Sequence, residues 1–260
     1  TTVVYPTPPH NKKEEAAEKL SALIKKYGVT AIAVGNGTAS KESEIFISEL
    51  IKNFDGVQYM MVSEAGASVY SASKLGAEEF PDFDVSLRSA VSIARRLEDP
   101  LAELVKIDPK SIGVGQYQHD MPEARLNETL NGVVEDCVNA VGVDINTASP
   151  SLLTRVAGLN ATIAKNIVTY REENGEFKDR KSLLKVAKLG AKTYTQCAGF
   201  FFVIGGKNIL DNTGVHPESY EAAEIKLKNI GFTHKDVADG HLGDFETKLE
   251  AEGTGKMAEI

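Results

Sequence analysis

Two short segments of the chain each combine a turn, a helix start and nearby lysines. Val156-Ala157-Gly158-Leu159-Asn160 lies between two helical patterns, and thirty residues later Val186-Ala187-Lys188-Leu189-Gly190 repeats the arrangement. The first N–H groups of a helix that follows a tight turn have no partner within that helix, and the helix dipole makes them attractive to anions. Lys165, Lys188 and Lys192 add positive charge near the two turns. This spacing predicts binding to the sugar-phosphate backbone of a nucleic acid without reading of its bases.

The candidate contacts are the two turns and the lysines beside them. They are Gly158, Leu159, Asn160, Lys165, Lys188, Gly190 and Lys192. Asn160 is expected to accept the left-handed backbone of its turn, as glycine and asparagine do, whereas Lys188 makes the second turn a poorer match. The alternative is a small helical bundle that serves only to pack domains together.

The distribution of charge favours the nucleic-acid interpretation. The whole chain carries a net charge of −8, which alone argues against a polyanionic partner. Residues 151–210, however, contain ten basic and four acidic residues, a net charge of +6, so the rest of the chain carries −14. A basic segment that coincides with the repeated turns is the pattern expected of a local phosphate-binding surface. Residues 107–145 hold seven acids and two bases and are not expected to face phosphates.

Two carboxylates in the first hundred residues could hold a metal. Glu64 follows a predicted strand, and Asp84 opens a predicted helix. Acids at the carboxyl ends of parallel strands are where metal-dependent nucleases bind Mg²⁺. Each also has an ordinary structural explanation, Asp84 as an N-cap and Glu64 as an acid at a helix start. We therefore expect no metal or cofactor, and Mg²⁺ only if the chain is a nuclease.

The elements that position these residues differ between the two parts of the chain. Residues 1–105 alternate strands and helices, which predicts a parallel α/β sheet. The predicted strands are 2–5, 29–34 and 57–62, and the predicted helices are 11–27, 40–54 and 84–97. A further helix is predicted over 101–107, and residues 106–146 form an acidic helical connector with a helix over 123–141. Residues 147–208 contain the two hairpins, with a helix from 192 to 205 after the second, and residues 209–260 form a helical tail.

The composition restricts the class of protein. A hydrophobic fraction of 42% and a charged fraction of 25% exclude wholesale disorder. No apolar run approaches the ~18 residues of a membrane helix, so no membrane partner is expected. Cys137 and Cys197 lie sixty positions apart with no CxxC pair, which argues against zinc and favours a reducing, cytoplasmic location. The chain opens with Thr1 rather than Met, so we expect a piece of a longer protein.

Several motifs resemble a known family when taken in order. The hairpins are similar to those of a tandem helix-hairpin-helix module, and the front part is similar to the YqgF branch of the RNase H-like fold. In its whole order the chain resembles the bacterial Tex family of transcription accessory proteins. The segments that carry this resemblance are 33–40, 63–71, 99–104, 108–120 and 216–220.

The resemblance implies both a fold class and a function. The fold is a partial α/β, YqgF-type RNase H-like domain, then an all-α tandem helix-hairpin-helix domain and a helical tail that precedes an S1-type OB-fold domain. The implied function is binding of RNA or DNA without sequence preference, alongside the transcription machinery. The YqgF-like domain is then not a working nuclease, and Glu64 and Asp84 are vestigial. Two alternatives stay open: a metal-dependent RNase H-like nuclease, and a protein-interaction scaffold whose acidic surfaces bind a basic partner such as polymerase.

Overall fold

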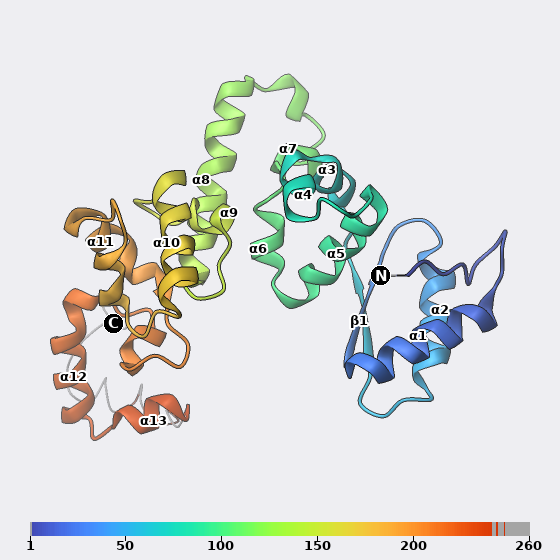
Figure 1. Ribbon diagram of the computed structural model, residues 1–260. Coiled ribbons are helices and arrows are strands. Elements are labelled where there is room, and N and C mark those ends of the chain that lie inside the picture. Colours follow the sequence, from blue (N-terminus) through green and yellow to red (C-terminus); the bar gives the residue numbers. More distant parts are fainter. Residues whose placement is uncertain (1, 241–242, 244–246, 248–260) are drawn as a thin grey trace. The chain divides into compact units, whose positions relative to one another are not determined.

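The computed structural model describes residues 2–240, 243 and 247 (Figure 1). The chain divides into two compact units, residues 1–122 and 123–260. No helix in the described ranges is both long enough and apolar enough to span a membrane.

The first unit is built on two parallel strands, which confirms the α/β prediction for the front of the chain. β1 (Ala31–Gly35) pairs with β2 (Gln58–Val62), with Ala31 opposite Gln58. α1 (Lys13–Tyr27) and α2 (Ser40–Ile51) pack beside them (Figure 1). The shared core consists of Ala16, Ile24, Val34, Phe46, Ile47 and Leu50.

Helices complete the first unit after β2. They are α3 (Ala67–Ala72), α4 (Lys74–Glu79), α5 (Val85–Glu98), α6 (Pro100–Leu104), α7 (Pro109–Ile112) and the 3-10 helix η1 (Gln118–Asp120). α5 is the long amphipathic member and contacts both strands and α3. Asp84 caps α5 by accepting a hydrogen bond from the Leu87 N–H at 2.8 Å, as the sequence predicted.

The strand predicted over residues 2–5 is wrong. Those residues form no ladder with another strand in the described structure. The chain instead reverses: the Asn11 N–H donates to the Thr7 carbonyl at 3.0 Å and the Lys12 N–H donates to the Tyr5 carbonyl at 2.8 Å. β-branched residues favour a strand only where a neighbouring strand can pair with them.

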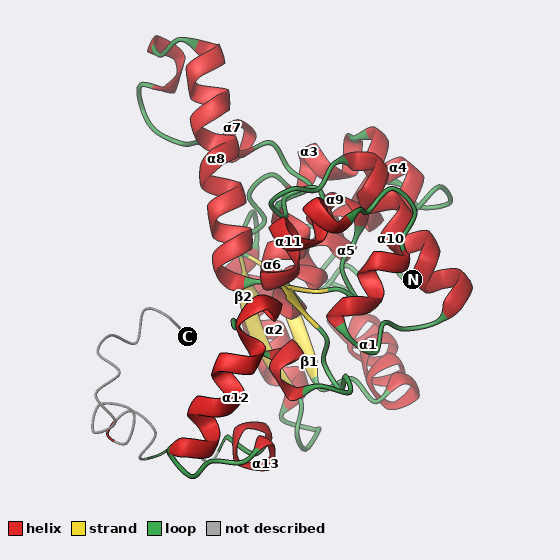
Figure 2. Cartoon of the chain, turned by 90° about the vertical axis from the view of Figure 1, so that its left-hand side faces the viewer, coloured by secondary structure: helices red, strands yellow, loops and turns green. Residues whose placement is uncertain are grey.

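The regular elements of the second unit are helices apart from two short strands (Figure 2). α8 (Glu123–Val141) matches its predicted range. After it come α9 (Pro150–Leu153), α10 (Ala161–Asn174), η2 (Arg180–Lys185), α11 (Ala191–Cys197), η3 (Ala198–Phe200), η4 (Ile209–Asn212), η5 (Pro217–Ser219), α12 (Tyr220–Asn229) and α13 (His234–Ala238).

The helix predicted to run to residue 205 is wrong, because α11 ends at Cys197. The apolar run that follows forms β4 (Phe201–Phe202), which pairs in parallel with β3 (Val143–Asp144). Phe201 is fully buried, so the run belongs to the core, although not as a helix. Gly142 permits this close packing because a Cβ there would collide with the Phe202 ring.

Candidate nucleic-acid interface

The two predicted hairpins have the same backbone turn. In the first, the Leu159 N–H donates to the Val156 carbonyl at 3.1 Å, and in the second, the Leu189 N–H donates to the Val186 carbonyl at 3.1 Å. The residue before each leucine has a positive φ, +78° at Gly158 and +67° at Lys188. The left-handed position is therefore occupied by glycine in one copy and by lysine in the other.

The helical segments before the turns also correspond. The Ser149 hydroxyl accepts from the Leu152 N–H at 3.3 Å, and the Asp179 carboxylate accepts from the Ser182 N–H at 2.7 Å. The equivalent apolar positions are buried in both copies: Leu153 and Val156 in the first, and Leu183 and Val186 in the second. The duplication predicted from sequence is confirmed.

The residue that caps the helix after the turn differs between the copies. Asn160 has extended backbone, with φ −122°, and its Oδ1 accepts from the N–H groups of Thr162 and Ile163 at 3.0 Å each. The expectation of a left-handed Asn160 is wrong, because Gly158 takes that role. Three of the nearby amides are not free, since Leu159, Thr162 and Ile163 use theirs within the protein.

The second copy leaves this cap open. Gly190 occupies the position of Asn160 with φ −85° and has no side chain to offer, and no side chain caps α11 in the described structure. Leu189 is buried, so the exposed atoms of this turn belong to Ala187, Lys188 and Gly190.

Exposed lysines flank the second turn in the sequence. Lys181, Lys185, Lys188 and Lys192 are all exposed, and so is Lys165 on α10. The Asn166 Nδ2 donates to the Ala187 carbonyl at 2.7 Å, so the part of α10 that carries Lys165 packs against the second turn. Lys165 is therefore carried by a segment that contacts the second turn.

The arginines counted in the basic segment serve the fold instead. Arg171 donates to the Ile145 carbonyl at 3.0 Å, and burial lowers the pKa of its guanidinium despite Glu172 and Asp144. Arg155 donates to Asn131 at 2.8 Å. The positive charge available to a ligand on this surface is therefore carried mainly by lysine.

Arg180, counted from the sequence only as one of the ten basic residues of 151–210, is the centre of a buried hydrogen-bond network. It is 0% exposed, and its Nε donates to the Phe201 carbonyl at 2.7 Å. Its other nitrogens donate to the Thr213 and Val215 carbonyls and to the Tyr220 hydroxyl. The Tyr220 hydroxyl in turn donates to the carboxylate of buried Asp211 at 2.6 Å, and burial together with this bond raises the pKa of Tyr220.

The partners of Arg180 lie 21 to 40 residues further along the chain. No local periodicity in the sequence identifies a buried arginine of this kind. The Asp179-Arg180 pair directly before an apolar segment is compatible with a buried arginine but does not by itself predict one.

Among the described residues, the two carboxylates of the first unit belong to no group of three or more potential metal ligands. The Asp84 Oδ1 holds the Leu87 N–H, and the Glu64 carboxylate lies over the turn after β1, where a Cβ on Gly37 would collide with it. The residues described include no group of three or more His, Cys, Asp or Glu suited to a metal. This donor set does not fit the two Mg²⁺ ions of a nuclease, and no metal-dependent step follows from it.

Comparison with protein families agrees with this organisation. The Tex protein YqgF-like domain matches residues 1–98, and a helix-hairpin-helix motif matches residues 138–202. A further helix-hairpin-helix domain matches residues 208–256, the range predicted only as a helical tail.

Similar proteins cover almost the whole chain. Transcriptional accessory protein Tex of Neisseria gonorrhoeae is 62% identical over 235 residues, which are 90% of this chain and 30% of that protein. Protein YhgF of Escherichia coli K12 is 60% identical over 239 residues, 91% of this chain and 31% of that protein. The human S1 RNA-binding domain-containing protein 1 is 43% identical over 296 aligned positions, 94% of this chain and 30% of that protein. The chain thus spans about a third of the length of these relatives.

Proposed function

Because the chain belongs to the Tex family of transcription accessory proteins, we propose that it binds RNA or DNA through the phosphate backbone and without sequence preference. The observation that carries this proposal is the second hairpin, where an exposed lysine occupies the turn itself and four others stand on neighbouring segments. The helix-hairpin-helix matches over residues 138–202 and 208–256 support it.

Binding of this kind is electrostatic. Each lysine that neutralises a phosphate releases a condensed counterion, so the affinity falls as the salt concentration rises. Lys165, Lys188 and Lys192 approach the backbone as point charges and read no base edges. In the whole protein, this contact would hold the transcription accessory factor on its nucleic acid while other parts meet the transcription machinery.

The test is the affinity of the chain for fluorescent single-stranded and duplex oligonucleotides at two salt concentrations. We expect binding at low salt, a log–log slope of a few units at about 0.9 per duplex phosphate, and equal affinity for unrelated sequences of one length. Combined Lys165→Glu and Lys192→Glu reversal should weaken binding at least tenfold.

The control is Lys52→Glu, which reverses one charge, half the change of the double reversal, at an exposed site of the first unit. The loss of affinity is compared per reversed charge. If that loss is the same for Lys52→Glu as for the double reversal, the effect is one of net charge and the hairpin surface is not the contact. Absence of binding at low salt would remove the proposal altogether.

A further inference from the structure

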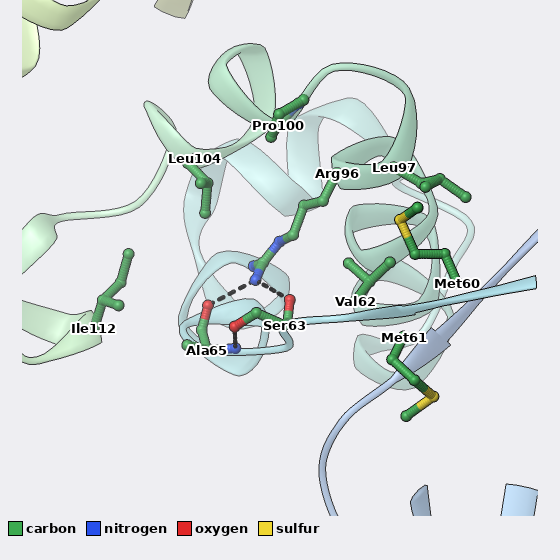
Figure 3. Close-up of a pocket in the computed structure, with 10 residues that line it drawn as sticks. All are labelled: Met60, Met61, Val62, Ser63, Ala65, Arg96, Leu97, Pro100, Leu104 and Ile112. Atoms are coloured by element: carbon green, nitrogen blue, oxygen red, sulfur yellow. Dashed lines mark hydrogen bonds between the residues drawn. The ribbon is translucent and has the colours of Figure 1, made fainter. Parts of the chain in front are cut away.

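A pocket in the first unit has no part in the nucleic-acid surface. It has a volume of about 490 Å³ and lies between the end of β2 and helices α5, α6 and α7 (Figure 3). Its walls are apolar, and they include Met60, Val62, Leu97, Leu104 and Ile112. A volume in this range suits a small organic ligand.

One charged side chain interrupts this apolar wall. Arg96 extends from α5, and its Nη1 donates to the Ser63 carbonyl at 2.7 Å and to the Ala65 carbonyl at 2.8 Å (Figure 3). The residue is only 6% exposed. The turn after β2 therefore fixes the guanidinium among the lining residues.

The remaining edge of this guanidinium has no acceptor. Arg96 Nε and Nη2 are both buried and make no hydrogen bond within the described structure. Buried polar groups are almost always paired, and an unpaired buried cation is costlier than an unpaired neutral group. Burial also lowers the pKa of Arg96, although Glu103 and Glu64 oppose that effect.

The acids near Arg96 leave its free edge unpaired. Glu103 is 2% exposed; its Oε2 accepts from the Lys106 Nζ at 2.9 Å, and its Oε1 is buried without a hydrogen-bond partner. The Glu64 carboxylate lies over Gly37. Neither makes an ion pair with Arg96 in the described part of the chain. No described side chain therefore supplies an acceptor for the free edge.

We propose that this pocket binds a small carboxylic acid with an apolar body, whose carboxylate reaches the buried Nε and Nη2 of Arg96 once the side chains that shield them shift. These two nitrogens form the side edge of the guanidinium, where parallel N–H groups match the two oxygens of a carboxylate. One cation balances one carboxylate, whereas a phosphate monoester would bring nearly a second charge into an apolar space. The body of the acid contacts Met60, Leu104 and Ile112, which are partly exposed at the mouth of the pocket.

Methionine methyl resonances measure whether a ligand binds in the pocket. The chain has four methionines, of which Met60 and Met61 line the pocket and Met121 does not. In a chain labelled with ¹³C at the methionine methyls, octanoate below its micellar concentration should shift the Met60 and Met61 resonances saturably and leave Met121 in place. 1-Octanol and octylamine have similar bodies without the carboxylate and should bind at least about tenfold more weakly.

Variants at the mouth avoid disturbing the buried arginine. Ile112→Glu places a like charge beside the carboxylate and should weaken octanoate binding at least tenfold. Val114→Glu is the matched control, since Val114 is similarly exposed in the same segment but does not line the pocket. Arg96→Lys keeps the charge without the two-pronged edge and should also weaken binding, with the Met121 resonance reporting whether the unit stays folded.

Two sources could present the same chemistry, a free acid or the carboxyl terminus of a peptide. A short peptide ending in leucine, compared with its amidated form, distinguishes them: tighter binding of the free-carboxyl peptide than of octanoate assigns the site to a chain terminus. Equal shifts with octanoate and 1-octanol, or no shift at Met60 and Met61 at millimolar acid, would overturn the proposal.

Discussion

The two hairpins share one backbone conformation but differ in the side chains that they expose. Both place a left-handed residue before a leucine and an extended residue after it, but the first uses Gly158 and Asn160 where the second uses Lys188 and Gly190. The first turn is closed, because Asn160 binds its amides and a Cβ on Gly158 would lie 2.8 Å from the Gln196 Cβ. The second turn is open and carries a cation.

The difference indicates that duplication preserved the geometry while the chemistry diverged. A residue with a side chain fits the left-handed position only where no neighbouring group occupies the space beside it. The N–H groups at the helix start remain available to a ligand only where no side chain accepts hydrogen bonds from them. We therefore expect the second hairpin to supply most of the phosphate contact and the first to supply packing.

Replacing Arg180 tests whether the second hairpin depends on its buried anchor. Arg180→Met leaves the Asp211 carboxylate buried without its cationic neighbour and removes hydrogen bonds to three carbonyls. We expect the free energy of unfolding to fall by about 3–5 kcal/mol, measured by urea denaturation. The control is Arg155→Met before the first turn, where a half-exposed guanidinium bonds to Asn131 and the loss should stay within about 1.5 kcal/mol. Similar losses in both variants would show that the anchors are equivalent.

Exchange of the left-handed residues separates stability from binding. Lys188→Gly relieves a positive φ and should stabilise the chain by about 0.5–1 kcal/mol, yet it should weaken nucleic-acid binding about fivefold because a phosphate contact is lost. The reciprocal Gly158→Lys should destabilise the chain, since the turn is strained and Gln196 occupies the space. Calorimetry and oligonucleotide titration measure the two effects. Unchanged affinity in Lys188→Gly would place the phosphate contact elsewhere.

Exchange of the cap residues should have smaller effects. Asn160→Gly frees the Thr162 and Ile163 amides at a cost of a few tenths of a kcal/mol, and we expect slightly tighter binding of nucleic acid. Gly190→Asn should do the opposite, with a small gain in stability and slightly weaker binding. Both are measured at low salt, where backbone contacts contribute most. Movement of the two affinities in the same direction would refute the idea that the caps distinguish the hairpins.

Acid titration tests whether the stability of the hairpins is independent of the stability of the first unit. Burial alone would raise the pKa of Glu79, but the hydrogen bond from Tyr70 and the charge of Lys106 lower it overall from 4.5. A lowered folded-state pKa contributes stability that is present above pH 4.5 and is lost as the pH falls through the folded value. Amide exchange measured across that window should therefore quicken around Tyr70 and Glu79. Glu79→Gln should reduce that pH dependence and leave exchange at Leu159 and Leu189 unchanged.

The sequence predicted the features that depend on neighbouring residues. The repeated apolar–Ala–x–Leu pattern, the Asp84 cap and the 123–141 helix were all correct because each is decided within a few positions. The left-handed residue was misassigned within its own pentapeptide, since Gly158 and Asn160 both tolerate positive φ and only the cap hydrogen bonds distinguish them.

Features that depend on distant residues were missed. The end of α11 is set by pairing of Phe201 with Val143, 58 positions earlier. Arg180 looks like any other base until segments 21 to 40 residues later surround it. Arg96 likewise has no local signal, because its acceptors come from the turn after β2, 31 and 33 residues earlier.

The guanidinium of Arg180 ties the approach to the second hairpin to three later segments that end at Tyr220, where α12 begins. Because one buried side chain holds these segments together, we expect them to move as a unit. A protein that binds α12 and displaces it would therefore displace the second hairpin and its lysines as well.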